Sequence, residues 1–502
     1  MKRQTVIDKP QELTAFPDEP RTEVVELAQV TPAFRPQSER ARGDIETALK
    51  ISAQWALKNT QLISDDAVKT LQGLVGEIDR VLTQQINEII HHQQFQKLES
   101  AWRGLHYLVN NTETDEMLQL RVMNISKQEL HRTLKWYKGA AWDQSPIFKR
   151  LYEEEFGTLG GKPYGAIVGD YYFDHSAPDV ELLTELSKVS AAAHAPFISA
   201  VAPSLFLMDS WQELANPRDL TTLFTTAEHT AWRSLRESED ARYLGLTLPR
   251  FLARMPYGAN ANPVDEFDFE EQTEGGASDK FCWANAAYAM AVNINRSFKE
   301  NGWCSRIRGV ESGGAVEGLP AHTFPTDDGG VDLKCPTEIA ISDRREAELA
   351  KNGFMPLLHK KNTDLAVFVG AQSLQKPPKY DDPNATANAN LAARLPYLFA
   401  TCRFAHYLKA IVRDKIGSFG GREEMTLWLH NWITQYVHGD PQHASEEEKA
   451  RQPLAAAEIV LEDIEGNPGY YRAKFYLKPH YQLEGLTVSL RLVSRLPSQA
   501  AT

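Results

Sequence analysis

Two neighbouring stretches between Leu391 and Val437 share a helical spacing of apolar residues. In each stretch these residues recur three or four positions apart, which places them on one face of an α-helix. The first face carries Leu398, Cys402, Ala405, Leu408 and Val412, and the second carries Met425, Trp428, Leu429, Trp432 and Tyr436. A glycine-containing segment at 417–421 separates the two. The pattern predicts two packed helices joined by a turn.

Charged residues gather on both sides of that turn. They are Arg413, Asp414, Lys415, Arg422, Glu423 and Glu424. One interpretation is a solvated turn held by salt bridges within the chain. The other is an ionic patch that the helix pair presents to a partner.

The middle of the chain alternates between two periodicities. Strand-like runs occupy 117–125, 164–172 and 197–203, and helical runs occupy 179–193 and 228–237. Such alternation is typical of an α/β domain. Beyond it, the composition predicts an exposed loop at 258–281, an amphipathic helix at 283–299, and a surface loop with short strands at 309–330.

The first 43 residues show no sustained periodicity and contain five prolines, which exclude a long helix. Only Thr22–Val30 is long enough for a strand or two helical turns. Having no core of its own, that segment is either unstructured or donated to another chain. A helical region follows from Gly43, with an apolar seam from Val68 to Ile89. The seam is either an internal core face or a partner-binding face.

The C-terminal end of the chain predicts β-structure. Leu486, Val488, Leu490 and Leu492 alternate with polar residues, and 471–477 alternates in the same way. The segment 457–464 adds a third predicted strand. Three strands at a chain end would form a small sheet whose edges are available for pairing.

Composition narrows the possible partners and compartment. The net charge is −13, from 67 acidic and 54 basic residues, which weighs against nucleic acid or an anionic membrane as the main partner. The four cysteines include no C-x-x-C pair, so zinc-finger spacing is absent and a reducing compartment is favoured. The first twenty residues lack the apolar run of a signal peptide, and Ala195–Met208 is too short to cross a bilayer. We therefore expect a cytoplasmic protein without membrane insertion.

The search for catalytic motifs gives little. The glycines at 157–161 precede Lys162 and then Pro163, where a P-loop needs Ser or Thr at the start of a helix. Because no H-E-x-x-H motif occurs, His91 and His92 do not form a zincin site. The best acid/base group is Asp170, Asp174 and His175, which follow a predicted strand. Their simpler role is to end that strand and bond the next loop. We expect no enzyme activity, no cofactor and no metal.

Several long segments resemble the large sheath subunit of the type VI secretion system, the TssC/VipB family. They are residues 95–109, 163–175, 197–206, 244–258, 335–357, 394–419 and 427–437. Similar segments span roughly residues 45–496, and each is far longer than a short motif. The resemblance implies a phage-tail-like structural protein of mixed α/β fold. The alternative is an uncharacterised α/β enzyme or small-ligand-binding protein.

The family resemblance also implies a set of partners. The chain would pair with a small sheath subunit of the TssB/VipA type and with neighbouring copies of itself. The resulting hexameric helical sheath would surround an inner tube of Hcp, stand on a baseplate and contract to propel the tube. A ClpV-type AAA+ ATPase would then disassemble the contracted sheath.

Together these arguments predict four regions and two kinds of contact. The regions are an extended arm at 1–43, a helical region that packs with the small subunit at 44–112, outer α/β domains at 113–380 and an inner sheath domain at 381–502. We hypothesise that Val24, Val25, Leu27 and Val30 form a donated strand beside a neighbour's C-terminal sheet. That sheet would contain Phe475, Leu486, Val488, Leu490 and Leu492. In parts of this family an N-terminal helix is instead the handle of the ATPase, so 22–30 has that second interpretation.

The ionic patch supplies the second kind of contact. The inner-tube candidates are Arg413, Asp414, Lys415, Arg422, Glu423 and Glu424. Contacts that must release during contraction should be polar and individually weak, about 0–1 kcal/mol each when exposed.

Overall fold

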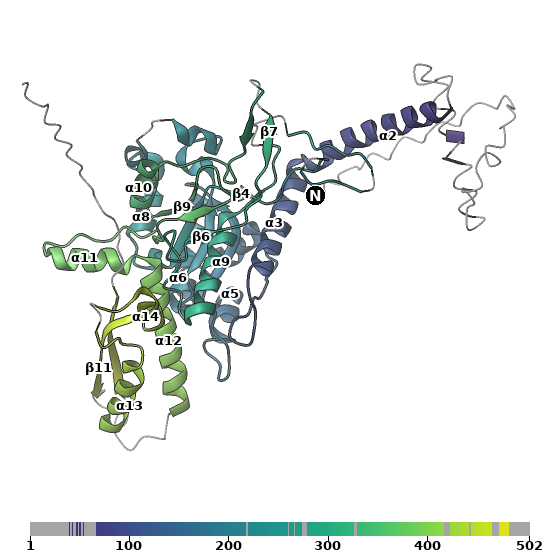
Figure 1. Cartoon of the computed structure of the whole chain (residues 1–502). Coiled ribbons are helices and arrows are strands. Elements are labelled where there is room, and N and C mark those ends of the chain that lie inside the picture. Colours follow the sequence, from purple (N-terminus) through teal and green to yellow (C-terminus); the bar gives the residue numbers. More distant parts are fainter. Residues whose placement is uncertain are drawn as a thin grey trace, which may run out of the picture. The chain divides into compact units, whose positions relative to one another are not determined.

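The three-dimensional description rests on a computed structural model of the chain (Figure 1). It describes residues 40, 43, 47–48, 50–51, 54, 67–216, 219–259, 261–265, 267–273, 279–325, 329–415, 422–440, 443–463 and 471–480. The chain divides into two units, residues 1–82 and residues 83–502.

Helices and strands alternate along the chain up to β10, and four described helices followed by two described strands form its C-terminal part. The α-helices are α2 Ala67–Ile90, α3 Gln93–Asn110, α4 Lys127–Trp136, α5 Pro146–Phe148, α6 Ala177–Ala193, α7 Leu220–Leu223, α8 Thr230–Glu237, α9 Ala286–Asn301, α10 Asp343–Lys351, α11 Pro383–Ala392, α12 Leu395–Lys415, α13 Arg422–Thr434 and α14 Glu446–Arg451. The shorter helical turns are η3 Gly139–Gln144, η4 Lys149–Glu153, η5 Pro203–Phe206, η6 Trp211–Ala215, η7 Ala227–His229 and η8 Asp240–Tyr243. The strands are β1 Ile167–Phe173, β2 Phe197–Val201, β3 Leu244–Leu248, β4 Phe251–Leu252, β5 Trp283–Ala284, β6 Ala315–Val316, β7 Thr323–Pro325, β8 Val331–Leu333, β9 Phe354–His359, β10 Ala366–Phe368, β11 Leu454–Asp463 and β12 Tyr471–Pro479.

A sheet of six described strands has the order β1-β2-β3-β9-β10-β6. It forms the centre of the α/β region, defined here as the elements from α3 to β10. Strands β1, β2, β3 and β9 are parallel, whereas β10 and β6 join antiparallel. Side chains alternate between its faces with the period of two expected for strands. On β9, Phe354 and Leu358 enter one core, while Met355 and Leu357 enter the other. A sheet covered on both faces reads as a continuous apolar run, as β2 and β3 do.

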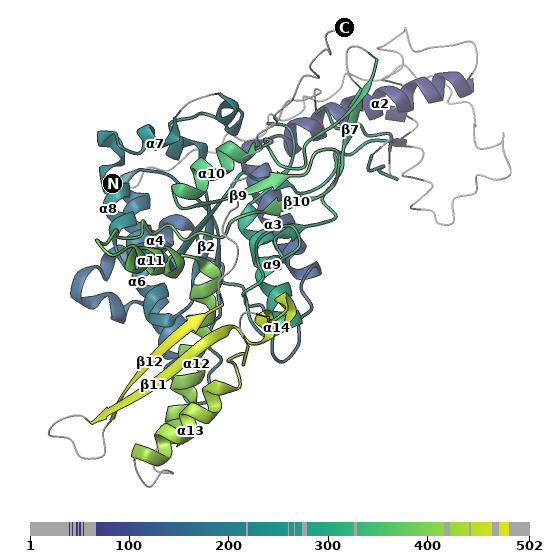
Figure 2. The ribbon, with the colours of Figure 1, turned by 60° about the vertical axis from the view of Figure 1, so that its left-hand side comes forward.

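Helices cover both faces of this sheet. The first core joins residues of α4, α6, α8 and α10 to the sheet, and the second joins α9, α3 and the N-terminal half of α12 (Figure 2). Helix α3 approaches α9 closely at Gly104, where a Cβ atom would lie 2.4 Å from the Tyr288 ring. A larger residue at 104 would therefore separate the two helices.

The predicted regular elements of the middle region are mostly confirmed. The runs at 164–172 and 197–203 contain β1 and β2, and those at 179–193 and 228–237 contain α6 and α8. The predicted strand at 117–125 is wrong, because these residues form no strand. Met117 and Val122 are exposed there. The apolar residues of this segment alternate, but the segment does not pair with any described strand. A local pattern alone does not make a strand.

Two further predictions in this region need correction. The segment 258–281 is not simply an exposed loop, because Phe269, Glu271 and Phe281 are buried. The helix predicted at 283–299 begins later, after the Asn285 N-cap, and residues 286–294 are buried on all sides. It is a central core helix, and the solvated polar face of an amphipathic helix is not found over residues 286–294. The segment 309–330 does contain short strands, of which β6 is buried in the main sheet.

The C-terminal module, defined here as α12, α13, α14, β11 and β12, confirms the predicted helix pair. Strands β11 and β12 pair antiparallel over their length, with Ile459 opposite Phe475. One face of this described two-stranded sheet packs on α12 and α13 around Phe404, Leu429 and Ile433. The two ribbon views show the hairpin beside these helices (Figures 1 and 2).

Candidate assembly site

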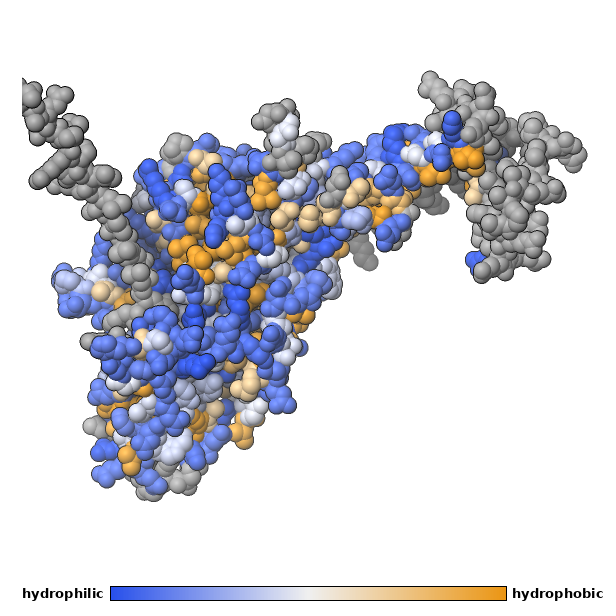
Figure 3. Space-filling view, viewed as in Figure 1, coloured by the Kyte–Doolittle hydropathy of each residue, from blue (hydrophilic) through white to orange (hydrophobic). Residues whose placement is uncertain are grey.

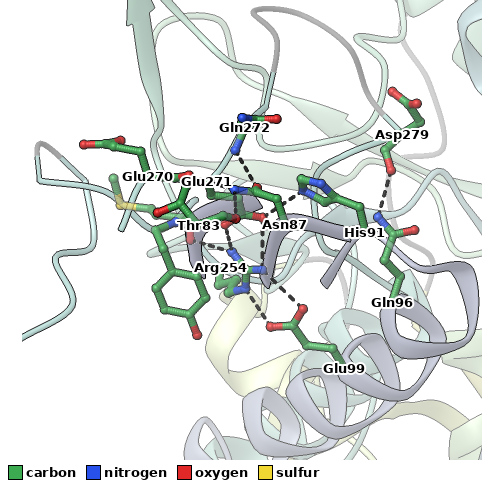
Figure 4. Close-up of polar contacts among 12 residues, drawn as sticks. Thr83, Asn87, His91, Gln96, Glu99, Arg254, Glu270, Glu271, Gln272 and Asp279 are labelled. Carbon is green, nitrogen blue, oxygen red and sulfur yellow. Dashed lines mark hydrogen bonds and ion pairs between the residues drawn. The ribbon is translucent and has the colours of Figure 1, made fainter. Parts of the chain in front are cut away.

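The junction between α2 and α3 is fixed to the α/β region by a buried polar network (Figure 4). The Asn87 carboxamide on α2 donates to the carbonyl of Glu270 at 3.0 Å and accepts from the amide of Gln272 at 2.8 Å. The side chain of Asn87 therefore satisfies one carbonyl and one amide of the 270–272 backbone, as the backbone of a neighbouring strand would. Further along, the side chain of Gln96 donates to the carbonyl of Asp279 at 2.9 Å.

Arg254 is the centre of the same network. Its Nε donates to Glu99 Oε1 on α3 at 2.6 Å, and its Nη1 donates to Glu271 Oε2 at 2.6 Å. His91 Nε2 lies 3.5 Å from the Glu271 carboxylate. The Arg254 and Glu271 side chains are only 6% and 1% exposed. Buried charges of this kind persist because they are paired and hydrogen-bonded.

The pKa shifts in this network follow from burial and pairing together. Burial by itself would lower the pKa of Arg254, but hydrogen bonds to Glu271 and Glu99 outweigh it and raise the pKa. Burial would raise the pKa of Glu99, but the hydrogen bond from Arg254 outweighs it and lowers the pKa. Both groups are therefore held in their charged forms.

Large apolar side chains lie exposed along α2 and α3. On α2, Leu71, Val75, Ile78 and Leu82 are exposed in the spacing of the predicted seam. Figure 3 shows apolar residues at the surface of this helix. Leu74 of the same seam is buried, so α2 carries both covered and exposed apolar side chains. On α3, Leu98 and Trp102 are 58% and 66% exposed.

An aromatic cluster joins the second predicted helix face to Phe404 of α12 and to Trp303, which lies outside the C-terminal module. Trp303 packs against Phe404 with ring centroids 4.5 Å apart, and Phe404 contacts Tyr436 at 5.5 Å. Trp432 lies 5.3 Å from Tyr436. Trp428, Trp432 and Tyr436 are only partly buried, so these side chains anchor the core and also retain surface.

The ionic patch residues lie at the ends of α12 and α13. Asp414, Lys415 and the three residues 422–424 are exposed. Lys415 Nζ lies 5.5 Å from the centroid of the Trp428 ring. Arg413 differs, because it is half-buried and its Nε and Nη1 atoms are covered without a hydrogen-bond partner.

The predicted strand-exchange residues are mostly outside the described residues. Val24, Val25, Leu27, Val30, Leu486, Val488, Leu490 and Leu492 all fall there. Phe475 is described, and it lies on β12 with its side chain against the core of the C-terminal module. The strand-exchange hypothesis stays a prediction.

The acidic group after β1 has structural contacts. Asp170 accepts a hydrogen bond from Asn285 at 3.2 Å, and burial raises its pKa. Asp174 accepts from the amide of Ser176 at 2.8 Å, two residues on. His175 lies beside His229, with ring centroids 5.0 Å apart. Asp170 thus bonds a distant helix cap, Asp174 bonds the loop that follows the strand, and His175 makes a ring contact.

Sequence reasoning missed the Arg254 network and the exposed face of α3. Arg254 is 155 positions from Glu99 and 17 from Glu271, separations at which one sequence gives no pairing signal. The face of α3 had a signal, because Phe95, Leu98 and Trp102 follow helical spacing. Spacing alone could not show that this face points to solvent.

Comparison with known proteins identifies the class. Residues 72–375 match the family described as VipB, EvpB/VC_A0108, tail sheath N-terminal domain, and residues 384–496 match its tail sheath gpW/gp25-like domain. A curated relative, the type VI secretion system sheath protein TssC1 of Pseudomonas aeruginosa, is 72% identical over 465 residues, covering 93% of each chain. These matches define a contractile tail-sheath protein.

The chain belongs to the VipB family and is the large subunit of a type VI secretion sheath. It is a structural protein, so the expectation that it is not an enzyme is confirmed by this relationship. Within the described residues, none of the helices combines the length and apolar character needed to span a membrane.

Solved contractile injection machines show more distant similarity. The anti-feeding prophage baseplate chain is 11% identical with a TM-score of 0.34, covering 63% of this chain and 67% of that one. A sheath chain of the extracellular contractile injection system PVC, in the contracted state, is 11% identical with a TM-score of 0.27. That match covers 62% of this chain and 68% of the other.

Proposed function

We propose that this cytoplasmic chain pairs with a small sheath subunit of the TssB/VipA type and builds a helical sheath around an Hcp inner tube. The sheath stands on a baseplate, contracts to propel the tube, and is then taken apart by a ClpV-type ATPase. The observation that carries the proposal is the 72% identity to a type VI sheath protein along nearly the whole chain. Energy is stored in an extended lattice and released when subunits rotate into tighter packing.

The four predicted regions divide this work. Residues 44–112 pack with the small subunit, and the exposed apolar seam of α2 supports that assignment. Residues 113–380 form the outer α/β part, and residues 381–502 form the inner part that faces the tube. Residues 1–43 form the arm that links neighbouring copies.

The linking arm must hold subunits together while they rotate. Strand addition meets this need, because backbone hydrogen bonds secure the joint while a proline-containing tether bends. In this proposal Val24, Val25, Leu27 and Val30 pair beside the sheet of a neighbour that contains β12 with Phe475, followed by Leu486, Val488, Leu490 and Leu492. The described β11–β12 pair supports it as a preformed template.

Deletion of residues 1–30 tests the arm. Co-expressed with the small subunit, the shortened chain should give a heterodimer that forms no tubules by negative-stain electron microscopy. Tubules of normal length would contradict strand donation. If tubules form but contracted sheaths resist the ATPase, the segment 22–30 is the ATPase handle instead.

The ionic patch of Arg413, Asp414, Lys415, Arg422, Glu423 and Glu424 contacts the inner tube in this proposal. The exposure of residues 414–415 and 422–424 supports it. Exchanging the charges with Arg422→Glu and Glu424→Arg keeps the net charge. It should abolish copurification of Hcp while empty sheaths still form. Exchanging Glu462→Lys with Lys474→Glu, an exposed pair on β11 and β12 of the same module, also keeps the net charge and is the matched control. Retained Hcp in the exchanged variant would count against the patch.

A further inference from the structure

Helix α12 belongs to the C-terminal module, but its buried side chains enter two different cores. Leu398 and Phe399 pack in the second core of the α/β region, whereas Phe404 and Leu408 pack in the core of the module. The helix contains 21 residues and therefore spans roughly 30 Å along its axis. Its only proline is Pro396 in the first turn, so no proline interrupts it between the two cores. One continuous helix thus joins the two parts (Figure 1).

An apolar contact with Trp303 holds one side of α12. Trp303 follows α9 in the α/β region and is buried. The centroid of its ring lies 4.5 Å from that of Phe404 and 5.4 Å from that of Tyr436. Apolar contacts are not directional, whereas hydrogen bonds weaken steeply when their angle changes. Trp303 therefore holds the module close without fixing its orientation.

Hydrogen bonds hold the opposite side of the same helix. Successive residues of an α-helix are about 100° apart, so Cys402, His406 and Lys409 share one side of α12 and Phe404 lies on the other. His406 is buried, and its Nε2 donates to the carbonyl of Ala193 at 2.9 Å. That carbonyl is in the last turn of α6, where carbonyls lack a partner within the helix. His406 therefore caps α6 from a different part of the chain.

Lys409 makes a second hydrogen bond on this side. Its Nζ donates to the Tyr152 hydroxyl at 2.9 Å and lies 3.9 Å from the centroid of the Phe156 ring. Tyr152 lies on η4, which is a π-helical turn. The buried Phe156 ring also contacts His406, with ring centroids 5.0 Å apart. We call this cluster the α12 latch: His406 and Lys409 on α12, held by Ala193, Tyr152 and Phe156.

The module has another contact with the α/β region, and that contact is less well packed. A cavity of about 30 Å³ lies there, and its lining includes Arg306 of the α/β region, Lys449 of α14 and His480 after β12. The Nε2 atom of His480 is covered without a hydrogen-bond partner. A cavity loses packing contacts, and a covered polar atom without a partner costs free energy. This contact is therefore poorly suited to fix the orientation of the module.

We propose that the α12 latch sets the angle between the C-terminal module and the α/β region, with Trp303 as the pivot. When His406 and Lys409 release their acceptors together, α12 tilts about Trp303 and its latch side leaves α6 and η4. The inference goes beyond the proposed function, and its test uses this chain alone. If the proposed function holds, the latch also determines how firmly the ionic patch at the end of α12 follows the α/β region during contraction.

Cys402 reports the opening of the latch without any added probe. Its side chain is 2% exposed on the latch side of α12, one turn before His406. A buried thiol reacts only while its site is open, so the labelling rate follows the open population when closing is fast. Cys282 lies beside β5 in the α/β region and is 4% exposed, which makes it the internal control. Peptide mass spectrometry after N-ethylmaleimide treatment of the full chain follows both cysteines separately.

Lys409→Met tests the latch directly, because it removes the ammonium group and keeps an unbranched side chain. Losing a hydrogen bond of a charged group changes a two-state ratio about tenfold, so Cys402 should react about tenfold faster than in the wild type. Cys282 should keep its rate. Lys449→Met is the matched control, since it makes the same substitution at the other contact. It should leave both rates unchanged.

Tyr152→Phe protects the test against misfolding. It removes only the hydroxyl that accepts from Lys409 and keeps the ring, which stacks on Phe148 with centroids 4.8 Å apart. Cys402 should again react faster, by a smaller factor, while Cys282 keeps its rate. The thermal unfolding midpoint of each variant, followed by circular dichroism, records whether the fold is retained.

Three results would overturn the latch. The first is a wild-type rate at Cys402 in both Lys409→Met and Tyr152→Phe. The second is equal acceleration at Cys402 and Cys282, because the whole chain would then open rather than the joint. The third is an acceleration at Cys402 in Lys449→Met that matches Lys409→Met, because the other contact would then share control of the angle. None of these results bears on whether the chain forms a sheath.

Discussion

The α/β region and the C-terminal module both use tryptophan and phenylalanine in their cores, but they bury these residues to different depths. In the α/β region, Trp232 and Phe354 are fully buried and stack with ring centroids 6.3 Å apart. In the C-terminal module, Trp432 and Tyr436 keep part of their surface in solvent. The aromatic core of the first region is therefore closed to solvent, whereas that of the second reaches the surface.

The largest difference between the two regions should appear on truncating their tryptophans. Trp232→Ala should lower the free energy of unfolding by about 3–5 kcal/mol, because the cavity lies in a dry core. Trp432→Ala should cost roughly half of that, because its side chain is only partly buried. Urea unfolding followed by circular dichroism measures both. Equal costs would show that the module is as closed as the α/β core.

The polar network of the α/β region should be nearly as sensitive. Arg254→Met should cost about 3–5 kcal/mol, because it leaves the Glu271 carboxylate buried without its cation. Replacing Arg254 and Glu271 together, as Arg254→Met with Glu271→Gln, should recover part of the loss. Denaturant midpoints of the wild type and both variants measure this. A double variant less stable than the single one would contradict the argument.

The contact between the regions should respond to acid through His406 on α12. Its Nε2 donates to the carbonyl of Ala193 at 2.9 Å, and burial lowers its pKa from 6.5 to about 4, an effect to which Arg403, His194 and Lys409 add. The unfolded chain therefore binds a proton first as pH falls. The stabilisation is complete above about pH 6.5 and is lost between 6.5 and about 4.

Thermal unfolding at pH 7, 6 and 5 measures that dependence. His406→Gln keeps a donor near Ala193 but does not titrate, so its stability should fall less on acidification, by on the order of 2 kcal/mol. His443→Gln, at an exposed side chain, is the control. Parallel pH profiles of the wild type and His406→Gln would show that another group carries the effect.

The smallest effects should come from surface ion pairs in both regions. Lys474 Nζ lies 2.6 Å from Glu462 across β11 and β12, and Lys376 Nζ lies 3.2 Å from Glu237 in the α/β region. Lys474→Ala and Lys376→Ala should each cost about 0–1 kcal/mol, because exposed pairs are screened by water. A much larger cost at Lys474 would mean that charge, not apolar burial, separates the two regions.

Much of the fold could be predicted where apolar residues kept one spacing over a long segment and the element that packs on it lay nearby in the sequence. The helix pair α12–α13, the strands β1 and β2, and the hairpin β11–β12 follow directly from spacing. The segment 117–125 misled the prediction, because an alternating run becomes a strand only when another strand pairs with it. For α9 the chain shows an amphipathic pattern, yet residues 286–294 are all buried, including the polar Asn293.

The sequence by itself determined the family, the absence of a catalytic frame and the residues able to form an apolar seam on α2. These properties are local, or are carried by long segments of recognisable order. Only the tertiary structure decided which apolar faces stay exposed, as Leu98 and Trp102 do, and which charges meet, as Arg254 meets Glu99 and Glu271. The physical reason is that burial and ion pairing depend on residues brought together from distant parts of the chain, whereas helical and strand spacing depend on near neighbours.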